Sequence, residues 1–136
     1  MNTKTLIAGL VGGVAAFFLD WGLYGIVLDG FMKAHTNQCM VAEMNMLTMI
    51  LHCLASGLAL AFILSWANVS SLVDGATKGA IAGLLLALST DLYLHSMTTY
   101  FVDMSGMAVD LLASTAMSAA VGGVVGWMLG RNAAAA

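Results

Sequence analysis

Two ionisable side chains, Asp91 and His95, lie one helical turn apart inside the apolar stretch of residues 79–101. An ionisable group within hydrocarbon costs several kcal/mol unless it faces a protein interior or a water-filled cavity. Each of the other three apolar stretches also carries such a group: Asp20, His52 and Asp110. A histidine beside a carboxylate exchanges protons near neutral pH. The first chemistry that these residues indicate is therefore the binding of a proton or another cation.

Each ionisable group belongs to a stripe of residues spaced by three or four, which share one face of a helix. The stripes are Gly13, Phe17, Asp20 and Tyr24; Asn45, Met49, His52 and Ser56; Asp91, His95 and Thr98; and Asp110, Ser114 and Met117. We expect them to converge at similar depth on an outward-facing pocket containing Asp20, Tyr24, His52, Asp91, His95 and Asp110. The alternative is that these groups only hold helices together, by hydrogen bonds worth up to about 2 kcal/mol each.

Methionine is abundant, with 11 residues in the chain. Thioether, thiol and imidazole groups together suit a soft metal ion such as Cu(I). The candidate metal ligands are His52, His95, Met49 and Cys53. Haem held by His52 and His95 is a further alternative. Against a metal site, no paired CxxC motif is present, and methionine is also an ordinary apolar filler.

The composition excludes a soluble domain, because only 8% of the 136 residues are charged, whereas soluble domains carry about a quarter. The four basic residues form no patch, which argues against nucleic-acid binding. Four apolar segments are long enough to span a membrane: residues 5–31, 43–67, 77–101 and 106–130. They predict one all-α transmembrane domain over residues 1–132, an up-down-up-down four-helix bundle. The alanine tail of residues 133–136 is uninformative.

The short connections place both termini on one side of the membrane, together with Lys4, Lys78 and Arg131, while Lys33 lies on the other. The positive-inside rule then predicts that both termini are cytoplasmic. The N-terminal segment also resembles a signal peptide. Its apolar run continues to Leu28, however, which is longer than the apolar region of a typical signal peptide, so we interpret it as a retained helix.

Glycines spaced by four predict close helix packing on the cytoplasmic side of the bundle. These are Gly9, Gly13, Gly79, Gly83, Gly122, Gly126 and Gly130. A homodimer contact through the Gly122 series is the alternative. An offset of 71 residues also aligns Gly12 with Gly83 and Asp20 with Asp91, so the two halves could be duplicated helical hairpins, with chance similarity as the alternative.

The segment Asp20-Trp21-Gly22-Leu23-Tyr24-Gly25, followed by Phe31-Met32-Lys33, resembles a family of small uncharacterised bacterial four-helix membrane proteins. That family carries a Trp-x-x-Tyr-like signature late in its first helix. The resemblance covers one helix and its loop, and the second tryptophan often seen after the phenylalanine is missing here. It implies a bacterial inner-membrane location, and it transfers no activity or functional residue.

Enzyme chemistry has little support, because HExxH, GxSxG and a glycine-rich phosphate loop are all missing. The sequence leaves two functions open. The first is a small carrier or channel-like protein that binds or translocates a proton or metal cation. The second is a non-catalytic accessory subunit of a larger membrane complex. The expected partners are the lipid bilayer and either further copies of the chain or other membrane subunits.

Overall fold

The computed structural model describes residues 3–37 and 45–131 of the chain, and all its regular elements are helical. They are α1 (Thr3–Gly22), the π-helix η1 (Leu23–Val27), α2 (Asp29–His35), α3 (Met46–Trp66), α4 (Leu72–Met97) and α5 (Met104–Gly130). Four helical stretches, α1 with η1, α3, α4 and α5, are each long and apolar enough to cross a bilayer. The chain is therefore a small four-helix membrane protein.

Side-chain caps explain where three of the helices begin. Asn45, Ser71 and Asp103 each accept a hydrogen bond from the backbone N–H three residues later, at Thr48, Asp74 and Gly106. Such caps satisfy backbone donors that the first helical turn leaves without partners. The cap at Ser71 starts α4 at Leu72, five residues earlier than predicted. α5 begins at Met104, within two residues of the prediction.

The first predicted segment, residues 5–31, differs most from the structure. A π-helical turn interrupts it, and the backbone N–H of Leu28 donates to the carbonyl of Leu23, five residues back, at 2.7 Å. The helix then resumes as α2 and reaches His35, which lies in the connection between the first two predicted segments. Helix α3 begins at Met46, and residue 43, its predicted start, lies outside the described residues. Helix α4 ends at Met97, before its predicted end at residue 101.

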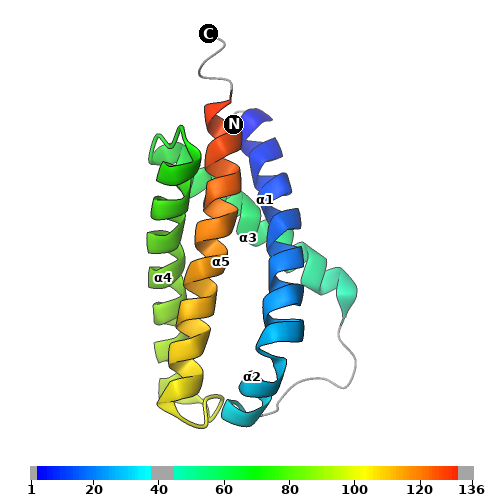
Figure 1. Ribbon diagram of the computed structural model, residues 1–136, viewed down its shortest axis with the longest axis vertical. Helices are drawn as coiled ribbons and strands as arrows, with labels where there is room; N and C mark the ends of the chain where they lie inside the picture. Colours follow the sequence, from blue (N-terminus) through cyan, green and yellow to red (C-terminus); the bar gives the residue numbers. More distant parts are fainter. Residues whose placement is uncertain (1–2, 38–44, 132–136) are drawn as a thin grey trace.

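The helices form two tightly packed pairs, α1 with α3 and α4 with α5, joined by contacts between α1 and α5. Helix α3 crosses obliquely behind α1 and α5, whereas α4 and α5 run side by side (Figure 1). Few residues of α3 and α4 touch each other. The bundle is therefore less closed than the predicted regular arrangement, and one side between α3 and α4 is left without close packing.

The first turn of α1, the last turn of α5 and the α3–α4 connection lie at one end of the molecule, which we call the terminal end (Figure 1). The opposite end, where α2 meets the α4–α5 connection, is called the hairpin end. Small and medium-sized buried residues fill the core near the terminal end: Ala8, Ala61, Leu64, Val69, Val121 and Val125. Large side chains do not fit in this part of the core, because glycines bring the helices close together.

Glycine contacts set the spacing within both pairs. An added Cβ at Gly79 would lie 2.9 Å from the Cα of Gly122, and one at Gly126 would lie 2.8 Å from the Cα of Gly75. All seven glycines of the predicted packing set lie in such close contacts within the chain. The Gly122 series faces α4, so the structure uses it for a contact inside the chain.

Helices α1 and α3 cross at glycines as well. A Cβ at Gly57 would overlap the backbone of Gly13, at 2.5 Å from its Cα. Crossings of this kind bring two backbones together at a point, and the helices diverge on either side of it. The divergence of α3 explains why it does not lie along α4.

Backbone hydrogen bonds tie α2 to the α4–α5 connection at the hairpin end. The N–H of Val102 donates to the carbonyl of His35 at 2.9 Å, and the N–H of Asn37 donates to Tyr100 at 2.7 Å. Asp103 accepts hydrogen bonds from the Ser105 hydroxyl and the Gly106 N–H, which hold the pKa of this carboxyl below its usual range. These bonds fix the start of α5, and with it the position of Asp110 two turns later.

Candidate cation-binding pocket

A cavity of about 420 Å³ lies between α1, α3, α4 and α5, toward the hairpin end of the bundle. Its polar lining comes from all four helices and from η1: Asp20, Tyr24, His52, Cys53, Ser56, Thr90, Asp91, Asp110, Ser114 and Ser118. Asp91 and Asp110 each lie six residues from the hairpin-end terminus of their helix, at Met97 and Met104. That places both about 9 Å along the helix from its end.

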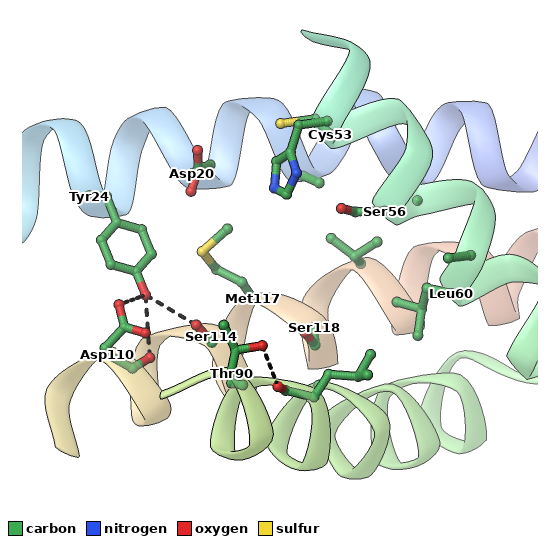
Figure 2. A pocket seen from close by; sticks show the side chains of 18 of the residues that line it. Asp20, Tyr24, Cys53, Ser56, Leu60, Thr90, Asp110, Ser114, Met117 and Ser118 are labelled. Atoms are coloured by element: carbon green, nitrogen blue, oxygen red, sulfur yellow. Dashed lines mark hydrogen bonds between the residues drawn. The ribbon is translucent and has the colours of Figure 1, made fainter. Parts of the chain in front are cut away.

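The π-helical turn places Tyr24 against α5. Its hydroxyl donates to Oδ1 of Asp110 at 2.8 Å and lies 3.2 Å from Oγ of Ser114. Figure 2 shows the tyrosine ring reaching from the helix that carries Asp20 across to these two side chains. π-Turns within α-helices often mark functional sites, because they re-aim side chains that an uninterrupted helix would direct elsewhere.

Asp91 is the most buried of the carboxylates, with 3% of its surface exposed. Its carboxyl group interacts with that of Asp110 on the neighbouring helix. Oδ2 of Asp91 is buried and has no hydrogen-bond partner among the described residues. Buried polar atoms are almost always hydrogen-bonded in folded proteins. A free carboxylate oxygen in the wall of a cavity therefore indicates a bound proton, ion or ligand group.

Asp20 completes the acidic cluster from α1. It interacts electrostatically with His52 on α3 and with Asp110 on α5. The Cys53 thiol is also within the electrostatic reach of Asp20. The pocket is thus lined by three carboxyl groups, one imidazole and one phenol, which come from five different helical elements. We refer to Asp20, Asp91 and Asp110 as the acidic triad.

No lysine or arginine balances the acidic triad. Within the described ranges, Lys33 pairs with Asp29 at 2.8 Å, Lys78 pairs with Asp74 at 3.0 Å, and Arg131 lies over the Trp127 ring. All four basic residues of the chain are absent from the pocket lining. Charges removed from water without a partner are costly. The cluster therefore needs protons or a cation from outside the chain.

Five of the six predicted ion-binding residues line this one pocket, and His95 does not. His95 is exposed, and across residues 3–37 and 45–131 it makes no hydrogen bond or ion pair, so the expected pairing with Asp91 is not formed. His95 is exposed because α3 diverges from α4, so no neighbouring helix covers the turn that carries it.

The predicted metal ligands are not brought together. His52 and Cys53 line the pocket, whereas Met49 and His95 lie outside it. Within the part of the chain that the structure describes, no group of three or more His, Cys, Asp or Glu residues could hold a metal ion. Haem ligation by His52 and His95 has no support either, since these residues do not share a cavity. Two further residues with soft sulfur groups, Cys39 and Met40, lie outside the described residues.

The residue spacing did not single out some of the side chains that line the pocket or pack the helices. Thr90 and Ser118 line the pocket, and Gly75 and Gly57 make helix contacts. Gly75 extends the four-residue spacing of Gly79 and Gly83, and Gly57 lies between Cys53 and Ala61 at the same spacing. Small residues at this spacing favour close helix packing, so the signal was present.

The comparisons with known proteins add no relationship. No family model matches the sequence, and the searches of the curated proteins and of the solved structures find no match. The function therefore has to be argued from the pocket.

Proposed function

We propose that this protein binds a cation, foremost the proton, at the acidic triad, and that this binding is the chemical step of a small carrier or channel. The buried Oδ2 of Asp91, which lacks a partner among the described residues, carries the proposal. Hydrogen bonds among the described residues do not account for this oxygen, because none of them donates to it. The carboxyl groups of Asp91 and Asp110 interact, and a proton bound between them would relieve the repulsion between two carboxylates.

The proposal is tested by infrared titration of the protein in lipid nanodiscs. Protonated carboxyl groups give a C=O stretching band distinct from that of carboxylates. We expect such a band from the acidic triad, declining as the pH is raised. D91N should reduce its amplitude by about one carboxyl group, since an amide replaces the acid without change of size.

The matched control is D74N, which removes a carboxylate from the exposed pair of Asp74 with Lys78 at the other end of α4. This variant should retain the wild-type band. The proposal fails if D20N, D91N and D110N each keep the full band. A pH gradient imposed on proteoliposomes then asks whether the bound proton crosses the membrane.

For the orientation, we propose a bacterial inner membrane with both termini in the cytoplasm. Lys4, Lys78 and Arg131 belong to the terminal end of the bundle and Lys33 to the hairpin end, so the positive-inside rule supports it. A fluorescent protein fused after the last residue should be fluorescent, and alkaline phosphatase at the same place should be inactive. The reverse pattern would place the pocket near the cytoplasm.

The second candidate function is an accessory subunit of a larger membrane complex. It is favoured by the exposed methionines Met97 and Met104 at the hairpin end and Met46 at the start of α3, which could contact a partner. Gentle purification from the native membrane decides between the two. Stoichiometric co-purifying subunits together with an unaltered band in D91N would favour this candidate.

A further inference from the structure

We propose that the cation for this site is an organic amine with an apolar body, which enters sideways from the bilayer between α3 and α4. This inference rests on the proposed cation site and names its ligand class. It comes from three properties of the pocket: its size, the separation of its charged and apolar parts, and the position of its opening.

The cavity is larger than a proton or a bare ion requires. Its volume of about 420 Å³ falls in the range of pockets for small organic ligands, about 300–1,000 Å³. The described residues also lack the ligand cluster that a metal ion would need. A molecule of several heavy atoms fits this space better than a single ion does.

The lining is divided along the bundle axis. The acidic triad lies toward the hairpin end. The part of the cavity nearer the terminal end is mostly apolar, with Leu60 and Ile63 on α3, Ala87 on α4 and Val121 on α5, and Ser118 is the polar side chain there. An ammonium group held by the triad would therefore leave its substituents against aliphatic side chains. A hydrophilic cation would leave that apolar wall without a suitable contact.

The cavity opens on the side where α3 and α4 make few contacts with each other. The lining residues that are exposed all belong to these two helices: His52, Ser56, Ala59 and Ile63 on α3, and Leu86 and Thr90 on α4. Those from α1, η1 and α5 are buried or half-buried. Leu86, at the opening, is 61% exposed. In a membrane this side meets lipid, so a ligand dissolved in the bilayer reaches the pocket directly.

Charge balance explains why the ligand should be cationic. The groups that face the acidic triad are Tyr24 from η1, and His52 and Cys53 from α3, beside the triad itself from α1, α4 and α5. None of these is a permanent cation. An alkylammonium ion would supply the positive charge in place of protons, so amine and protons should compete.

The test uses two probes of the same shape. Benzyltrimethylammonium carries the charge, and neopentylbenzene has carbon in place of nitrogen and is neutral. Radiolabelled benzyltrimethylammonium is bound to the protein in nanodiscs of neutral lipid, with empty nanodiscs subtracted. We expect unlabelled cation to displace the label at least about tenfold more effectively than neopentylbenzene, and D91N to weaken binding by about tenfold or more.

Two further variants separate the apolar part from the carboxylates. A87F fills the cavity from α4, and A59F does so from the exposed lining of α3, which keeps the test valid if A87F fails to fold. Either should weaken benzyltrimethylammonium binding and leave the infrared titration unchanged. D74N should affect neither measurement.

The outcomes distinguish the two proposals. Charge-selective binding that depends on Asp91 and is blocked by the phenylalanine variants supports both. Titration of the triad together with equal displacement by the two probes would overturn the amine proposal and leave the proton site standing. If the triad does not titrate and no probe binds, both proposals fail.

Discussion

G122A should lower the stability of the protein against denaturant by about 1–3 kcal/mol, the usual cost of overpacking a tight contact. A methyl group at this position would overlap the carbonyl of Gly75 and lie 2.9 Å from the Cα of Gly79. Both obstacles are backbone atoms of α4, so no side chain can move aside. The two helices would have to separate, and the pairing of α4 with α5 would weaken along its length.

The adjacent residue offers a matched control. A Cβ at Gly123 would make ordinary contacts, at 3.6 Å to the Cβ of Ala76 and 3.7 Å to the Cγ of Leu72. G123A should therefore be neutral or gain up to about 1 kcal/mol from the higher helix propensity of alanine. Titration with sodium dodecyl sulfate in mixed micelles, followed by circular dichroism, measures both. Equal stability of the two variants would contradict the close packing at Gly122.

Y24F should destabilise the protein by about 1–2 kcal/mol and change the infrared band of the acidic triad. The phenol donates to Asp110 and also contacts Ser114, so its removal leaves two polar groups in the pocket without that partner. Because Asp110 in turn interacts with Asp91, the loss should also alter where the triad holds its proton. The second effect separates a role in the site from a role in packing alone.

Tyr93 provides the matched control, since it lies on α4 with 60% of its surface exposed. Y93F should leave both the stability and the infrared band unchanged. If Y24F loses stability but keeps the wild-type band, Tyr24 only fastens η1 to α5. If neither quantity changes, the hydrogen bond to Asp110 contributes nothing measurable.

The four spanning helices, and the helix face on which each carboxylate lies, could be predicted from residue types and their spacing. Hydropathy and length are local properties, so the four spanning segments could be recognised without any knowledge of their neighbours. The cap at Ser71 was equally local, because the hydroxyl accepts from a backbone N–H three residues away, but it was overlooked, and the predicted start of α4 was five residues late. Here the sequence contained the information, and the prediction did not use it.

The site itself could be predicted only in part. Periodicity places Asp91 and His95 near one face of one helix, but it does not fix how far the neighbouring helix extends along that face. The crossing of α1 and α3 at Gly13 and Gly57 decides this, because two backbones in contact at one point must diverge elsewhere. As a result Asp91 is buried and His95 is exposed.

Residue types and spacing were enough to predict a four-helix membrane protein, with an acidic group on one face of three helices, a histidine on the fourth and small residues where helices meet. Which of these groups share a pocket depends on how the helices pack against one another. This packing set the π-turn that carries Tyr24 to Asp110, and it left the side between α3 and α4 open. The physical reason is that residue spacing fixes directions within a helix, whereas crossing angles and changes of helical phase depend on contacts between distant segments.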